Sequence, residues 1–187
     1  MEQVIKILKE SGEFDDYEDY LIYGNPANPV SIMLFEKRLL FEKVVGTFKD
    51  PTRLFICSLG IPSTKCLNYI RTLRTKKILY FGDLDPVSFF TFLTFLYAKR
   101  KPAPKGKQEI NIKYAGVSLM DYKKYLSDKN VLIKISDLEK IVLNFIEKFK
   151  IPQLRHEIEF LKKTGKKIEI EALNLLNLEM YLKDKIE

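Results

Sequence analysis

Residues 78–86 read Ile-Leu-Tyr-Phe-Gly-Asp-Leu-Asp-Pro, an apolar run that ends in two acidic residues one position apart. The apolar part predicts a buried strand, and Asp83 and Asp85 then follow its carboxyl end. In an extended chain, side chains at i and i+2 point to the same side, so both carboxylates can face one cation. Such oxygen ligands suit Mg²⁺, which usually binds one or two carboxylates and keeps several waters. The alternative is an ordinary loop, because Gly-Asp-x-Asp-Pro is also typical of turns.

Two further apolar runs lie upstream, and each is followed by a helical pattern. Residues 30–35 end at Glu36, and residues 54–57 form the second run. The two aspartates are followed by the most apolar stretch of the chain, residues 89–98, which predicts a buried helix. Three strands that alternate with three helices predict an α/β fold with a parallel sheet and right-handed crossovers. Glu36 and the two aspartates are therefore expected at the same edge of one sheet.

Several short motifs follow one another in a distinctive order. They are Phe35-Glu36-Lys37, Leu59-Gly60-Ile61-Pro62, Gly82-Asp83-Leu84-Asp85-Pro86, Tyr114-Ala115-Gly116-Val117 and the carboxy-terminal residues 155–159, 165–173 and 181–186. This order resembles the Toprim fold of topoisomerases, primases and some nucleases. It is most similar to the A subunit of the type IIB topoisomerase, topoisomerase VI, and to its relative that makes meiotic double-strand breaks. The resemblance implies a Toprim domain over residues 30–187, with a parallel-core sheet flanked by helices and a helical carboxy-terminal region, after an amino-terminal extension at residues 1–29.

The resemblance also implies roles for individual residues. Glu36, Asp83 and Asp85 are expected to be catalytic and to bind Mg²⁺ against a DNA phosphate, with Glu36 serving as a ligand or as an acid/base. In the topoisomerase, a tyrosine in a preceding winged-helix domain attacks DNA, and residues 1–29 are too few for such a domain. A winged-helix partner is therefore expected to supply that tyrosine. Tyr17, Tyr20 and Tyr23 have a different sequence context and are not expected to attack DNA.

The sequence departs from the family pattern next to the acidic motif. The family usually has an aromatic residue and a glycine after Asp-x-Asp-Pro, whereas Val87 and Ser88 stand here. Cys66 and Leu67 stand where the family usually has Thr-Arg. Whether these changes impair activity stays open at this stage.

The net charge of +7 and its distribution indicate a nucleic-acid partner. One basic cluster, here called the basic loop, follows the predicted buried helix and is expected to hold DNA near the acidic site. Its members are Lys99, Arg100, Lys101, Lys105 and Lys107. Lys37 is expected to contact DNA as well. The alternative for the basic loop is a solvated lysine-rich surface. Residues 157–171 carry mixed charges and predict a solvated helical face.

Three functions remain open. The leading hypothesis is a Mg²⁺-dependent Toprim domain that acts on DNA with a partner. The alternatives are a stand-alone metal-dependent DNA nuclease and a non-catalytic DNA-binding or assembly module. The sequence contains no membrane-span or signal-peptide pattern, so a cytoplasmic location is expected. Whether the chain cleaves DNA, the form of its substrate, and its oligomeric state, including a homodimer, are left open.

Overall fold

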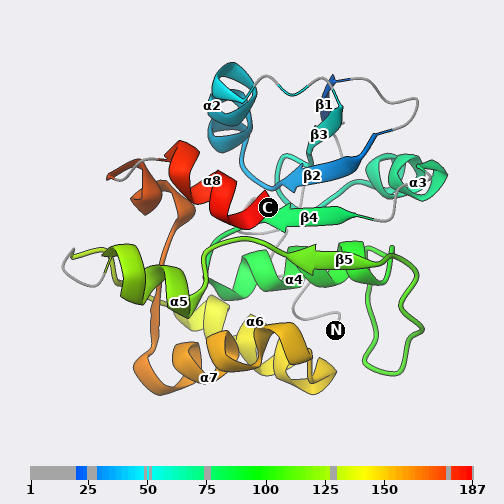
Figure 1. The fold of residues 1–187 in the computed structure, drawn as a ribbon. Helices are drawn as coiled ribbons and strands as arrows, with labels where there is room; N and C mark the ends of the chain where they lie inside the picture. The colour runs from blue at the N-terminus through cyan, green and yellow to red at the C-terminus, as the bar shows by residue number, and fades with distance from the viewer. Residues whose placement is uncertain are drawn as a thin grey trace.

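The fold is built on one five-stranded sheet with the order β1-β3-β2-β4-β5 (Figure 1). The computed structural model describes residues 20–24, 29–48, 50, 52–73, 77–126, 130–175 and 178–186. The strands are β1 (Leu21–Gly24), β2 (Ser31–Phe35), β3 (Arg53–Cys57), β4 (Ile78–Phe81) and β5 (Ile112–Tyr114). Strands β2 to β5 are mutually parallel, and β1 pairs antiparallel with β3. The predicted α/β class with a parallel core is confirmed.

Strand β1 lies in a segment where the sequence pattern predicted no strand. It is a short edge strand, and three of its four residues are exposed. An edge strand of four mostly exposed residues lacks the apolar run that marks a buried strand. The described sheet therefore begins before residue 30.

The connections between strands reverse direction at the centre of the sheet. Helix α2 (Arg38–Thr47) leads from β2 to β3, whereas α3 (Thr64–Thr72) returns from β3 to β4 on the other side of β2. Helix α4 (Pro86–Leu96) then continues outward to β5. Neighbouring strands β2 and β4 thus send their connections in opposite directions, which is a topological switch point. Ligand sites of open α/β sheets form at the carboxyl ends of such strands.

Helix α4 is buried along its whole length, as its uninterrupted apolar sequence predicted. One side packs on the sheet, where the rings of Phe92 and Phe95 each lie 5.7 Å from the ring of Tyr80. The other side packs on α6 (Asp137–Ile146), with Phe90 5.9 Å from Phe145. Because both faces are packed, the amino end of α4 is a rigid support for the residues that begin it.

The carboxy-terminal half is largely helical and folds back over the sheet. Its remaining elements are α5 (Leu119–Asp121), η1 (Tyr122–Leu126), β6 (Ile133–Lys134), η2 (Glu147–Phe149), η3 (Pro152–Leu154), α7 (Arg155–Thr164), β7 (Lys166–Lys167), η4 (Ile170–Leu175) and α8 (Leu178–Ile186). Strand β7 pairs with β6, and the next residue, Ile168, forms a bridge with Leu84 between the two aspartates. The carboxy-terminal segment is thereby brought against the loop after β4. Within the described residues, none of the helices has the length and apolar character needed to cross a membrane.

Candidate metal-binding and active site

Three acidic residues meet where β2 and β4 end. Phe35 pairs with Phe81, so Glu36 and the loop of Asp83 and Asp85 begin side by side at the carboxyl edge. All three are buried, with exposed fractions of 7% for Glu36, 3% for Asp83 and 6% for Asp85. Buried carboxylates need compensating charges or hydrogen bonds. Their partners therefore indicate what the site can bind.

Two hydroxyl groups hold the Glu36 carboxylate. Tyr80 donates a hydrogen bond to Glu36 Oε2 over 2.6 Å, and Ser88 Oγ donates to the same oxygen. Ser88 also donates its backbone N–H to Asp85 Oδ1 over 2.6 Å, which caps helix α4. Burial, and then the charge of Glu36, raises the pKa of the Tyr80 hydroxyl well above its usual value. These groups fix Glu36 relative to the aspartates.

Asp83 is held by one lysine and one backbone amide. Lys37 Nζ lies 2.7 Å from Asp83 Oδ2, and the N–H of Ile170 donates to Asp83 Oδ1 over 2.8 Å. Lys37 also lies 2.8 Å from Glu171 and 4.0 Å from Glu169. Burial alone lowers the pKa of Lys37, but Asp83 and Glu171 more than offset this, so that its pKa lies above the usual value. Lys37 is thus a charged partner of Asp83 inside the site.

A second lysine completes the charge network. Lys167 Nζ lies 2.9 Å from Glu139 and 3.6 Å from Glu169. The charges of Lys167 and Glu139 both act on Asp85, with opposite effects on its pKa. Across the described part of the chain, this network joins two lysines, Lys37 and Lys167, to six carboxylates: Glu36, Asp83, Asp85, Glu139, Glu169 and Glu171. The site therefore carries excess negative charge.

Comparison with known proteins gives this acidic edge a context. A family profile for the Toprim domain shared by the A chain of topoisomerase 6 and by Spo11 matches residues 31–186. The chain belongs to this family. It is 26% identical over 171 residues to the meiotic recombination protein SPO11-1 of Arabidopsis thaliana, and 24% identical over 183 residues to the A-type polypeptide of the type 2 DNA topoisomerase 6 of Sulfurisphaera tokodaii. These alignments cover 83% and 86% of this chain but 47% of each relative, so the chain spans about half the length of the curated relatives it matches.

The donor set of this Toprim domain fits the chemistry of a divalent cation. Burial, and then the charge of Asp85, raises the pKa of Asp83 to about 7, while burial and then Glu36 raise the pKa of Asp85 to about 7. Mutual repulsion of buried carboxylates is relieved when a cation binds between them. No three acidic, histidine or cysteine side chains of the described residues converge on one point to hold an ion as they stand. Mg²⁺ needs only one or two carboxylates and keeps its waters, so the Toprim aspartates suffice as ligands.

The basic loop does not lie beside the acidic site. It follows α4, which starts at the acidic edge and runs back along the sheet, so the loop lies at the amino end of the strands (Figure 1). Contacts agree with this position, because Arg71 at the end of α3 pairs with Glu109 and donates to the carbonyl of Ala98. Lys99 also pairs with Glu109. Of the basic residues expected to contact DNA, only Lys37 is placed at the acidic edge of the Toprim domain.

The prediction of a solvated helical face over residues 157–171 holds only in part. Helix α7 is amphipathic, and Arg155 and Glu159 form an exposed ion pair. Residues 166–169 are not helical, and they enter the site with Ile168 and Ile170 buried. The alternation of charged and apolar residues from Lys166 to Glu171 is a strand signal that could have shown this.

Several other residues of the site also escaped the sequence patterns. They are Tyr80, Ser88, Tyr114 and Glu139, together with Lys167, Glu169 and Glu171. Tyr114 donates its hydroxyl to the carbonyl of Asp83. Close backbone packing supports the same loop, because a Cβ atom on Gly116 would lie 2.1 Å from the carbonyl oxygen of Gly82. Apart from the glycines, these contacts join segments whose spacing in sequence gives no local motif.

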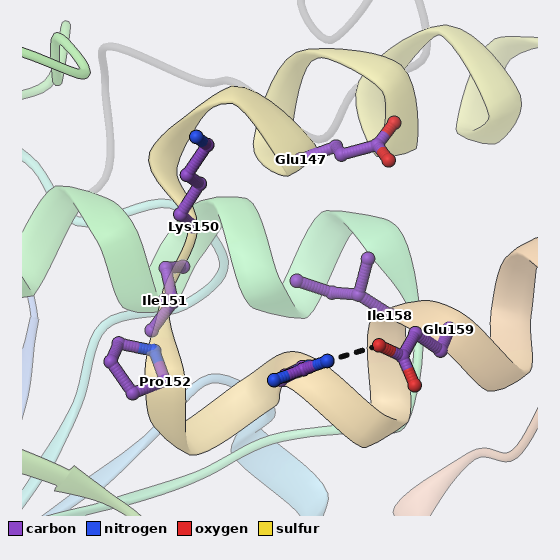
Figure 2. A pocket seen from close by; sticks show the side chains of 7 residues that line it. Glu147, Lys150, Ile151, Pro152, Ile158 and Glu159 are labelled. Carbon is purple, nitrogen blue, oxygen red and sulfur yellow. Dashed lines mark hydrogen bonds and ion pairs between the residues drawn. The ribbon is translucent and has the colours of Figure 1, made fainter.

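One surface pocket lies away from the acidic site (Figure 2). It has a volume of about 400 Å³ and lies between the end of α6 and the start of α7. Its apolar lining comes from Ile151, Pro152 and Ile158, and charged side chains surround these residues. The pocket shares no residue with the acidic network, so it is separate from the Toprim site.

Proposed function

We propose that this chain is a Mg²⁺-dependent Toprim domain that acts on DNA through Glu36, Asp83 and Asp85. The observation that carries the proposal is the convergence of these buried carboxylates at the switch point of the sheet, in a network with excess negative charge. We further propose that residues 30–187 form the Toprim domain and residues 1–29 an extension. The family membership supports DNA as the partner.

The bound ion would supply charge stabilisation for a DNA phosphate and its leaving oxygen. Asp83 and Asp85 would hold it, and Glu36 would stand beside them as a third anionic group. Lys37 can neutralise Asp83 in the metal-free protein, as it does here. Its ammonium also gives the acidic edge a group that can contact a phosphate.

The nucleophile is proposed to come from a winged-helix partner. The two tyrosines of the described residues that contact the acidic site are already engaged: Tyr80 donates to Glu36, and Tyr114 donates to the carbonyl of Asp83. Burial, followed by nearby carboxylates, raises the pKa of both hydroxyls well above the usual value. Both are therefore poor nucleophiles. Tyr17 lies outside the described residues.

A plasmid assay tests the proposal against its alternatives. Purified chain is incubated with supercoiled plasmid, with and without Mg²⁺, and with and without a winged-helix protein that carries a tyrosine. Cleavage that requires both Mg²⁺ and the partner supports the proposal. Mg²⁺-dependent cleavage by the chain alone favours a nuclease, while DNA binding without cleavage under any condition favours a non-catalytic module.

A further inference from the structure

Ser88 contacts all three acidic residues of the proposed site. Its Oγ donates to Glu36 and accepts the backbone N–H of Asp83 over 2.9 Å, while its own N–H binds Asp85. Its exposed fraction is 1%. A single buried side chain thus links the end of β2 to the loop after β4.

The direction of these hydrogen bonds is determined by the donors. The Asp83 N–H occupies the Ser88 oxygen as an acceptor, so the Ser88 proton points to Glu36. Tyr80 adds a second proton to the same Glu36 oxygen. Hydrogen bonds in such a chain polarise and strengthen one another. Because Ser88 belongs to the first turn of the buried α4, this chain ties Glu36 to a rigid support.

The backbone at Gly82 makes room for both hydroxyls. A Cβ atom there would lie 2.9 Å from Ser88 Oγ and 2.8 Å from the Tyr80 oxygen. Any side chain at this position would push the two hydroxyls away from Glu36. The family pattern usually has glycine in place of Ser88, and glycine cannot make the link. The arrangement is therefore a feature of this chain's own sequence.

We propose that Ser88, assisted by Tyr80, is a positioning residue that fixes the spacing between Glu36 and the two aspartates and thereby favours Mg²⁺ over Ca²⁺. The proposal rests on the proposed metal-binding function of the same site. Mg²⁺ requires near-ideal octahedral geometry at short distances, whereas Ca²⁺ accepts longer and irregular coordination. A site loosened by loss of the Ser88 hydroxyl should therefore lose more affinity for Mg²⁺ than for Ca²⁺.

Calorimetric titration of each ion into the purified, metal-free protein tests this. In Ser88→Ala, the Mg²⁺ affinity should fall by roughly 10- to 100-fold, in the range found for other groups that orient metal ligands, and the Ca²⁺ affinity should fall less. The matched control is Thr94→Val, which also removes a buried hydroxyl hydrogen bond from α4, but one made to the carbonyl of Thr91. The control should leave the ratio of the two affinities unchanged.

The outcomes separate this proposal from the function on which it rests. If the wild type binds neither ion, the metal-binding function fails and the positioning role fails with it. If the wild type binds both ions and Ser88→Ala keeps their affinity ratio, only the positioning role is refuted. If Ser88→Ala does not fold, Tyr80→Phe provides the test, because it removes the other hydroxyl from the same oxygen. An unchanged ratio in that variant refutes the proposal as well.

Discussion

The raised pKa values of the acidic pair predict an unusual dependence of stability on pH. Asp83 and Asp85 have pKa values of about 7 in the folded chain, against 3.8 for an ordinary aspartate. The folded state therefore binds more protons than the unfolded state between these values. The free energy of unfolding must then fall as pH rises through this window. Carboxylates with lowered pKa values, such as Asp50 and Asp184, act in the opposite direction but only at lower pH.

The size of the effect follows from the number of protons retained. If the strongly interacting pair keeps one proton, unfolding free energy should fall by roughly 2 to 3 kcal/mol between about pH 5 and about pH 7.5. Urea unfolding in the presence of a chelator measures this change. The control is the Asp83→Asn, Asp85→Asn double variant, in which neither side chain titrates and the fall should disappear.

Mg²⁺ should oppose this loss of stability, because it binds the deprotonated aspartates. At about 100 times its dissociation constant, the ion stabilises the folded state by about 2.7 kcal/mol. The stabilisation should be present near pH 7.5 and much smaller near pH 5, where protons compete. Stability of the metal-free wild type that rises from pH 5 to pH 7.5 would refute the reasoning about the buried pair.

Four further predictions concern the site and its surroundings. Calorimetry should detect Mg²⁺ binding to the wild type and none to the Asp83→Ala, Asp85→Ala double variant; equal binding by both would remove the site assignment. Replacing all five members of the basic loop by Ala should flatten the dependence of log K for DNA on log salt by roughly 0.9 per lost phosphate contact, while Mg²⁺ affinity stays the same; an unchanged slope would make the loop a solvated surface only. No tyrosine of the isolated chain should become linked to labelled DNA, and an adduct that survives denaturation but is lost in a Tyr17, Tyr20 or Tyr23 variant would contradict this. Gly116→Ala should destabilise the chain by about 1 to 3 kcal/mol in urea unfolding because of its contact with Gly82, whereas Gly46→Ala, with open space around it, should not destabilise it.

The central strands and the three acidic residues could be predicted from sequence because their signals are local. The apolar runs before Glu36 and Asp83 predict buried strands, and parallel strands bring their carboxyl ends to one edge. The family resemblance, now confirmed by the matched profile, added the fold name. What the residues at this edge do stays a prediction.

The placement of the basic loop shows the limit of local reasoning. Its members follow α4 closely in sequence, which suggested that they lie near the acidic motif. A helix of 11 residues extends about 16 Å, however, and α4 carries the chain to the far end of the sheet. If the loop binds DNA, it does so at a distance from the aspartates.

The carboxy-terminal part of the site could not be predicted for a different reason. Ile170 and Asp83 are 87 positions apart, and Lys37 and Glu171 are 134 positions apart. No periodicity links residues at such separations. Glu139 had a local explanation as well, because it forms the capping box of α6 with Ser136.

The long sequence separations within the acidic network also make the site a record of complete folding. Contacts that close large loops form only after the entropy of loop closure has been overcome, and they tend to be made late. Asp83 acquires its amide partner only when residues 168–170 have crossed the loop after β4. Helix α8 holds that crossing segment from behind, through the ion pair of Lys185 with Asp121 and the bond from Lys77 to the carbonyl of Ile186. A nascent chain still emerging from the ribosome would thus carry its catalytic acids unassembled, and chemistry on DNA would wait for the last helix to dock.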